Sequence, residues 1–296
     1  MTYSIELNKE QINVIIKQYK EYQLPNKTQY MHFFAKINNA TLTIYNSNRV
    51  VIQGADADNI YQRICTLLNI KAESKSITKT VKPSFNFSII GSDEVGTGDY
   101  FGPIIVCACF VPKDKIIEVR NLGVQDSKKL TDYKIISIAP VLIKSLVHSV
   151  VLLNNFKYNE VSKIANMNKV KAIMHNEALS KLVTRNINYD KIIVDGFTDT
   201  EKYYQYLDKI KSPVQNVDLV PKGEDKYIAI AAASVIARYH FIKEMDALSQ
   251  KYNYELPKGA GKPVDEMLSK IIHDDNKDIL INIAKLNFNN SKKIKK

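Results

Sequence analysis

Four acidic residues stand where the secondary structure predicted from the sequence changes. Two end a first strand, one ends a second strand, and one directly precedes a long helix: Asp93 with Glu94, Asp195, and Glu224. In open α/β sheets the loops at strand ends converge around a ligand, so these carboxylates are candidates for one shared site. Neighbouring strand residues point to opposite faces, and the glycines that closely follow Glu94 would allow the bend that brings both acids into one site.

Clustered carboxylates favour hard cations. Each pair about 4 Å apart repels by roughly 4 kcal/mol at an effective dielectric near 20, so such a site needs protons or cations. Oxygen ligands without Cys or His select Mg²⁺ or Mn²⁺ rather than zinc, and two such ions can activate water and stabilise the leaving oxygen in phosphodiester cleavage. On spacing alone, the alternative is that these acids are ordinary solvated residues. The sequence holds no Walker-type phosphate loop, which argues against a nucleotide cofactor.

The elements that would position these acids lie in residues 86–288, the predicted catalytic domain. We expect strands at 87–94, 104–111, 148–153, 192–194 and 214–220, and helices at 168–184 and 227–248. Antiparallel strands followed by strands that alternate with helices predict an α/β fold with a mixed sheet flanked by helices. Cys107 and Cys109 share one face of the second strand, which indicates packing in a reducing compartment and predicts a cytoplasmic protein.

Residues 1–70 are predicted to form a separate small α+β domain. A helix capped by Asn8, with Gln11 three residues later, is followed by three short antiparallel strands and a second helix at 56–68. Residues 71–85 are polar and lack an apolar stripe, so we interpret them as a linker, and residues 289–296 as a basic tail.

The strand alternation in this small domain predicts one apolar face and one open face. Met31, Phe33, Ala35 and Ile37 would face the helices, and four residues of the same strand would be displayed for contact with nucleic acid: Tyr30, His32, Phe34 and Lys36. The alternative is that this second face packs on the following domain.

The net charge of +11, from 42 basic and 31 acidic residues, points to a polyanionic partner. Nucleic acid is the first candidate and an anionic membrane surface the second. The apolar runs are too short to span a bilayer, and the N-terminus lacks the features of a signal peptide, so we expect no membrane association.

Four segments together carry a resemblance to the type 2 ribonucleases H, and most closely to ribonuclease HIII. They are SDEVGTGDYFGP at 92–103, DSKKL at 126–130, IIVDGF at 192–197 and KGED…AIAAASVIARY at 222–239. Their order and distances agree with the family, and the match covers nearly the whole chain. The first domain resembles the TATA-binding-protein-like extension of ribonuclease HIII.

The resemblance implies a ribonuclease H-like fold and endonucleolytic cleavage of the RNA strand of RNA–DNA hybrids. The ends left would be 5′-phosphate and 3′-hydroxyl, the metal would be Mg²⁺ or Mn²⁺, and the expected state is a monomer. It also implies that Asp93, Glu94, Asp195 and Glu224 bind metal, with Asp93 bridging two ions. Asp225 is the competing choice for the fourth position, but the spacing to Ala231 favours Glu224.

Two further segments are predicted to contact the substrate. Gly96, Thr97 and Gly98 stand where ribonuclease HII enzymes have a Gly–basic–Gly motif whose backbone reads the ribose 2′-hydroxyl, and Thr97 departs from that pattern. This departure predicts weak cleavage at a single ribonucleotide embedded in DNA. Three residues of the second motif are candidates for phosphate contact, although a solvated basic turn would look the same: Ser127, Lys128 and Lys129.

Two alternatives to this function stay open at the level of sequence. One is a ribonuclease HII-like enzyme that also cuts at single embedded ribonucleotides, and the other is a hybrid-binding protein without catalysis. The five histidines lie in separate segments without metal-ligand spacing, and we interpret His175 as a structural hydrogen-bonding residue rather than a base.

Overall fold

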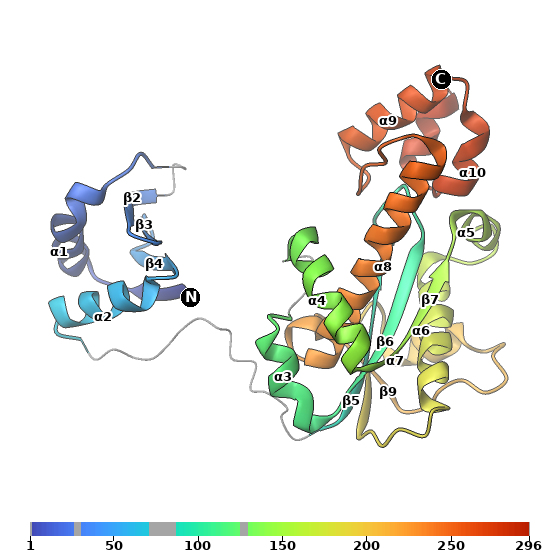
Figure 1. Cartoon of the computed structure of the whole chain (residues 1–296), viewed down its shortest axis with the longest axis horizontal. Coiled ribbons are helices and arrows are strands. Elements are labelled where there is room, and N and C mark those ends of the chain that lie inside the picture. Colours follow the sequence, from blue (N-terminus) through green and yellow to red (C-terminus); the bar gives the residue numbers. More distant parts are fainter. Residues whose placement is uncertain (1, 27–30, 71–86, 125–129, 296) are drawn as a thin grey trace. The chain divides into compact units, whose positions relative to one another are not determined.

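The computed structural model describes residues 2–26, 31–70, 87–124 and 130–295. The chain divides into two compact units, Met1–Lys82 and Pro83–Lys296, and each is described by itself (Figure 1). The predicted linker, 71–85, lies outside the described residues. Within the described part of the chain, no helix has both the length and the apolar character that crossing a membrane requires.

The first unit is a four-stranded antiparallel sheet with two helices. Its elements are β1 (Thr2–Glu6), α1 (Lys9–Tyr19), η1 (Lys20–Tyr22), β2 (Met31–Ile37), β3 (Ala40–Tyr45), β4 (Arg49–Gly54) and α2 (Ala57–Leu67), in the sheet order β1-β4-β3-β2. The predicted cap is confirmed, because Asn8 and Gln11 form a capping box at the start of α1. The sequence analysis missed β1, a five-residue edge strand too short for its alternation to stand out.

The core of this unit lies between the helices and one face of the sheet. Apolar residues of α1 and α2, among them Ile12 and Ile64, pack against Phe33, Leu42 and Ile52 from the strands. This confirms the inner face that the strand alternation predicted for residues 33–37.

The alternation predicted for β2 is wrong at two residues, Phe34 of the open face and Met31 of the inner face. Phe34 is buried, with 5% of its surface exposed, and the chain after η1 runs along this edge strand, where the Leu24 amide donates to the Phe34 carbonyl. A register shift between Met31 and Phe33 places Met31 opposite Tyr45, so Met31 does not share the inner face. A bulge of this kind reverses the side-chain alternation, which a period-two pattern cannot reveal.

The other three residues predicted on this face differ in their surroundings. Lys36 is exposed on β2 as expected. His32 is also exposed, but it lines a pocket with Lys9 and Asn13 of α1 rather than a continuous open sheet. Tyr30 lies outside the described residues.

The second unit is built on a mixed five-stranded sheet. The strands are β5 (Ile89–Val95), β6 (Ile104–Val111), β7 (Val147–Leu153), β8 (Lys191–Asp195) and β9 (Val217–Val220), in the order β7-β6-β5-β8-β9. β5 pairs antiparallel with β6 and parallel with β8, and β8 pairs parallel with β9. The mixed sheet predicted from the sequence is therefore confirmed, with strand limits that differ by up to three residues.

Helices cover both faces of this sheet (Figure 1). The α-helices are α3 (Ile116–Asn121), α4 (Asp132–Ser145), α5 (Asn155–Val161), α6 (Met167–Val183), α7 (Thr200–Tyr206), α8 (Ile228–Tyr252), α9 (Lys262–His273) and α10 (Leu280–Ile283). Short 3₁₀ helices are η2 (Lys113–Lys115), η4 (Gly223–Asp225), η5 (Lys277–Ile279) and η6 (Asn289–Lys295). The predicted basic tail thus contains a helix, and its Asn290 is buried against Ala260 and Asp265.

Two separate apolar cores show which helices cover which face. Ile105, Cys107 and Cys109 of β6 pack in one core with α8, α4 and α9, whereas Val106 and Ala108 pack in the other with α6 and α7. All three cysteines of the chain are buried and free, and for Cys107 and Cys109 this agrees with the packing predicted from their apolar strand.

The long helix α8 approaches β5 at Gly91. A Cβ atom there would lie 2.3 Å from the carbonyl carbon of Ala229, so only glycine allows this contact. The alanine-rich start of α8 serves the same purpose, because its small side chains, from Ala229 to Ala233, are fully buried against the sheet. This close packing fixes the start of α8 against β5.

Candidate active site

Asp93 and Glu94 point to opposite faces of the sheet. Asp93 is paired in register with Cys107, whose side chain belongs to the α8 core, and Glu94 is paired with Val106, whose side chain belongs to the α6 core. Directly opposed residues of an antiparallel pair share a face, so the Asp93 carboxyl lies on the α8 side and the Glu94 carboxyl on the α6 side. The predicted bend does not bring both side chains onto one face.

The other two predicted ligands, Asp195 and Glu224, come from the end of β8 and from the short helix η4 that precedes α8. Asp195 ends β8, the parallel neighbour of β5, and its Oδ1 accepts a hydrogen bond of 2.8 Å from the Gly223 amide. Glu224 follows in η4, and its Oε2 atom is buried. Gly223 is required here, since an added Cβ would lie 2.5 Å from the Ile230 side chain. The hydrogen bond from the Gly223 amide to Asp195 therefore connects the end of β8 with the segment that carries Glu224.

The Asp93 carboxyl is a buried acid among other acids. Burial raises the pKa of Asp93 well above its usual value, and the charges of Glu94 and Asp195 raise it further. Two hydrogen bonds act in the opposite direction: one from the Ser234 hydroxyl of α8, and one of 2.7 Å from the Glu94 amide to Asp93 Oδ1. Asp93 thus lies close enough to Glu94 and Asp195 for the charges of both to act on it.

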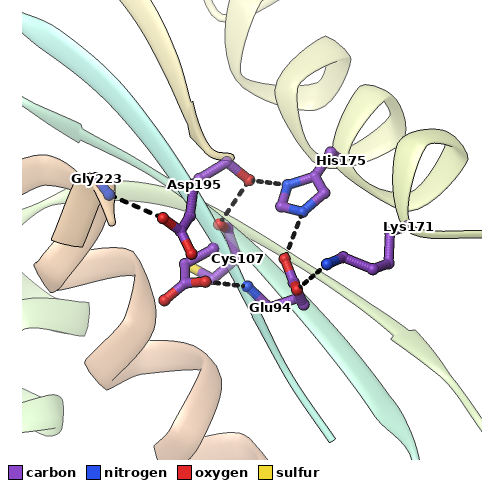
Figure 2. A network of polar contacts seen from close by, with 8 residues as sticks. Glu94, Cys107, Lys171, His175, Asp195 and Gly223 are labelled. Carbon is purple, nitrogen blue, oxygen red and sulfur yellow. Dashed lines mark hydrogen bonds and ion pairs between the residues drawn. The ribbon is translucent and has the colours of Figure 1, made fainter. Parts of the chain in front are cut away.

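The Glu94 carboxyl has the opposite surroundings (Figure 2). Nζ of Lys171 lies 2.5 Å from Glu94 Oε1, and Nε2 of His175 lies 2.9 Å from Oε2. Burial acts to raise the pKa of Glu94, but the hydrogen bonds and charges of His175 and Lys171 outweigh burial and lower it. Glu94 is therefore held as a carboxylate on the α6 side.

His175 is itself fixed by a buried chain of contacts. Its Nδ1 lies 2.7 Å from the Ser92 hydroxyl, which also lies 2.9 Å from the Cys107 carbonyl oxygen and donates to it. The imidazole ring is fully buried and stacks on Phe197, with 5.4 Å between ring centroids. This agrees with the interpretation of His175 as a hydrogen-bonding residue, but its partner is one of the predicted site residues.

The sequence analysis did not identify Lys171 as a residue of this site, nor Glu94 as the partner of His175. A usable signal exists in the sequence: the two residues stand four apart in the predicted helix at 168–184, next to inward-facing Val170 and Met174. Polar residues at i and i+4 on the buried side of a helix require a partner, and a buried lysine requires an acid.

The donor set fits a hard divalent cation. It consists of carboxylate oxygens, with a buried oxygen at Glu224 and a raised pKa at Asp93 that a cation would lower. Among the residues that the structure describes, no three His, Cys, Asp or Glu side chains are placed to hold one ion between them. The two oxygens of Glu94 contact Lys171 and His175 of α6.

Two family models match the chain. The one described as ribonuclease HII matches residues 90–291, and one described as a domain of unknown function (DUF3378) matches residues 3–77. Ribonuclease HIII of Streptococcus mutans is 40% identical to the chain over 297 residues, which cover 99% of this chain and 97% of that one. The chain belongs to the ribonuclease HIII family.

Solved structures of relatives agree with this membership. Bst-RNase HIII in complex with Mn²⁺ has a TM-score of 0.70 and 35% identity, covering 99% of this chain and 98% of that one. Ribonuclease H2 from Pyrococcus horikoshii OT3 has a TM-score of 0.58 and 27% identity, covering 70% of this chain and 96% of that one. The predicted ribonuclease H-like fold, with a small α+β domain before it, is confirmed, and so is the prediction of a metal-dependent endoribonuclease.

The loop of this ribonuclease HIII family member between β5 and β6 contains the three residues predicted to read the 2′-hydroxyl. Gly96 has φ +96° and is buried, and a Cβ there would lie 2.1 Å from the Pro103 carbonyl oxygen, so glycine is required. Gly98 is exposed, with no heavy atom within 4 Å of an added Cβ, and Thr97 is half-buried. Backbone at Gly98 is thus open to close approach by a ligand.

The end of this loop is anchored by a buried lysine. Lys285 is fully buried, and its Nζ donates to the carbonyl oxygens of Asp99, at 2.8 Å, and Gly102, at 2.5 Å. Burial lowers the pKa of Lys285 to about 7, although Asp99 acts to raise it. The predicted phosphate contacts Ser127, Lys128 and Lys129 lie outside the described residues.

Proposed function

We propose that this chain hydrolyses the RNA strand of RNA–DNA hybrids with two divalent ions, Mg²⁺ or Mn²⁺, and leaves 5′-phosphate and 3′-hydroxyl ends. The ligands would be Asp93, Glu94, Asp195 and Glu224. The observation that carries the proposal is the position of Asp93, a carboxyl buried on the α8 face of β5, whose pKa is raised by burial and further by the charges of Glu94 and Asp195. A buried cluster of that kind is costly without a cation and becomes favourable with one.

Neighbouring groups orient three of the four proposed ligands. The Gly223 amide and the Ser234 hydroxyl orient Asp195 and Asp93, respectively. Lys171 and His175 orient Glu94. When bound, the divalent ions would generate the attacking hydroxide from water and stabilise the leaving oxygen. The buried surroundings strengthen every charge interaction at the reacting phosphate.

Substrate recognition would come from the loop after β5 and from the first unit. The open backbone at Gly98 suits close contact with a 2′-hydroxyl, which distinguishes RNA from DNA. Exposed Lys36 and His32 would contact the hybrid, in keeping with the net charge of +11. Since Thr97 supplies no charge, we expect cleavage at a single embedded ribonucleotide to be weak.

The protein is proposed to act in the cytoplasm as a monomer. Its three free, buried cysteines suit a reducing compartment.

The decisive experiment measures cleavage and affinity of a labelled hybrid for wild type, Asp195→Asn and Asp218→Asn, with Mg²⁺, Mn²⁺ or chelator. Asp218→Asn is the matched control, because Asp218 is an exposed acid on the adjacent strand β9. We expect Asp195→Asn to bind hybrid but to lose cleavage, and the control to behave as wild type. Cleavage that persists in excess chelator would overturn the proposal, and binding without cleavage by the wild type would favour the non-catalytic alternative.

A further inference from the structure

Lys171 and His175 together form a clamp on Glu94. They stand one helical turn apart on α6, and each contacts a different carboxylate oxygen: Lys171 the Oε1 atom and His175 the Oε2 atom (Figure 2). A carboxylate has about four lone-pair positions, so this arrangement uses one on each oxygen and leaves one on each for another ligand. The clamp therefore fixes the plane of the carboxylate without saturating it.

The clamp is supported from behind by the chain that follows Asp195. Phe197 lies two residues after Asp195, and Lys171 Nζ lies 4.1 Å from its ring centroid. The His175 ring stacks on the same aromatic side chain, with an interplanar angle of 16°. Phe197 thus links the end of β8, which provides one acid of the site, to the two groups that hold another acid.

Stability alone does not explain these contacts. The Lys171 side chain is 11% exposed and the Glu94 side chain 10%, so the ion pair is formed away from water. Removing two charges from water costs about as much as their attraction returns, and a well-packed apolar pair is often as stable. We therefore consider how the Lys171–Glu94 ion pair affects the neighbouring acids.

The charge of Lys171 affects the binding of a divalent ion beside Glu94. A cation 2.5 Å from Glu94 neutralises part of the negative field that attracts a divalent ion, and it repels the ion directly. At the same time the orientation of Glu94 is fixed before any ion arrives. Binding in the absence of substrate is thereby weakened, while the geometry for turnover is preserved.

We propose that Lys171 and His175 are positioning residues that orient Glu94 and that Lys171 weakens divalent-ion binding on the Glu94 side of the site. The ion on this side would then be held firmly only when the charge of the substrate phosphate is present. This inference rests on the proposed role of Glu94 as a metal ligand.

The test compares Mn²⁺ binding in the absence of substrate with turnover on hybrid. Titration calorimetry of the full chain with Mn²⁺ gives affinity, and cleavage at saturating Mn²⁺ gives kcat and KM. For Lys171→Met we expect Mn²⁺ to bind about 10-fold more tightly and kcat to fall about 10- to 100-fold. Lys171→Arg, which keeps the charge, should restore the wild-type Mn²⁺ affinity.

The matched control is Lys181→Met on the same helix. Lys181 stands ten residues after Lys171 on α6 and forms an exposed ion pair of 2.7 Å with Glu177. We expect wild-type Mn²⁺ affinity and wild-type kcat for this variant. If Lys171→Met does not fold, Lys171→Gln keeps a hydrogen-bond donor without the charge, and the same tightening is expected.

The outcomes separate this inference from the function on which it rests. Wild-type Mn²⁺ affinity in Lys171→Met and Lys171→Gln, together with weaker binding in Glu94→Gln, would overturn the inference and leave the metal site intact. A rise in KM alone would assign Lys171 to substrate binding and would equally overturn it. Unchanged Mn²⁺ affinity in Glu94→Gln would instead contradict Glu94 as a ligand and remove the proposed function.

Discussion

The two faces of the sheet at the end of β5 give neighbouring acids opposite surroundings. On the α8 face, Asp93 accepts a hydrogen bond from Ser234, and burial with two acidic neighbours raises its pKa. On the α6 face, Glu94 contacts Lys171 and His175, which lower its pKa in spite of burial. Two consecutive residues of β5 therefore differ in their charged neighbours. The charges that act on Asp93 are those of other acids, whereas those that act on Glu94 come from Lys171 and His175.

This difference shows how a fold can separate two requirements of a metal site. The α8 face supplies affinity, because a buried acid among acids gains most from a cation. The α6 face supplies orientation, because Glu94 is held by two donors on a rigid helix. Experiments that treat the two acids alike should therefore give unlike results.

The largest expected effect is on catalysis by Asp93→Asn. Loss of the central carboxylate should lower hybrid cleavage by at least about 10³-fold, since bound ions supply several kcal/mol of transition-state stabilisation. Single-turnover cleavage of a labelled hybrid measures this loss. An Asp93→Asn rate within about 10-fold of wild type would show that this acid is not central.

The second effect is on the stability of the metal-free protein, where the two acids should differ in sign. Glu94→Gln leaves buried Lys171 without its charge partner and should lower the free energy of unfolding by about 3 kcal/mol. Asp93→Asn removes a buried carboxyl that must either hold a proton or carry a charge beside other acids, and it should raise the free energy of unfolding by about 1 kcal/mol at pH 7. Urea unfolding in chelator measures both, and changes of equal sign would contradict the contrast between the faces.

The third prediction concerns the pH dependence of metal-free stability. The raised pKa of Asp93 means that the folded state keeps a proton that the unfolded state has lost. Stability from this group is fully present below about pH 4 and declines as pH rises towards the folded pKa, by up to about 1.4 kcal/mol per pH unit. Urea unfolding of Asp93→Asn at several pH values should lack this decline, and an unchanged profile would count against the raised pKa.

Lys285 should give the opposite slope at higher pH. Its folded pKa of about 7 lies below that of an unfolded lysine, so between about pH 7 and 10.5 the unfolded state binds the extra proton. Stability should therefore rise with pH in this window, by up to about 1.4 kcal/mol per unit, and Lys285→Met should flatten the rise. Unfolding curves at pH 7, 8 and 9 provide the measurement, and a wild-type slope in Lys285→Met would be the contrary result.

The smallest expected effect is on hybrid affinity through the first unit. Lys36→Ala should weaken binding a few-fold and reduce the salt slope by about one charge, because Lys36 is exposed on β2. Phe34→Leu should leave affinity unchanged, since Phe34 is buried. Salt-dependent binding assays compare the two, and a larger loss for Phe34→Leu would restore the predicted open face.

Much of the catalytic fold follows from local patterns. The apolar strands, the glycines near Asp93 and the alanine-rich start of α8 are signals that a few neighbouring residues carry, and the structure contains the corresponding elements. The resemblance in four motifs then located the acids, which the structure gathers around the ends of β5 and β8.

The remainder depends on tertiary contacts that no local pattern contains. The partner of Lys171 and His175 lies about eighty residues earlier in the chain, so the clamp on Glu94 follows only from the packing of α6 on the sheet. The bulge in β2 reverses the alternation at Met31, and Phe34 is buried, so the alternation misplaced these two residues. A five-residue edge strand such as β1 has too few residues for its pattern to be distinctive.

Anomalous diffraction at the manganese edge, from crystals of the full chain grown with Mn²⁺ and hybrid, would test the central claim most directly. We expect two peaks that share Asp93 as a ligand, one also bound by Glu94 and the other by Asp195 or Glu224. Manganese bound elsewhere, with Asp93 still hydrogen-bonded as it is here and no ion beside it, would contradict the account.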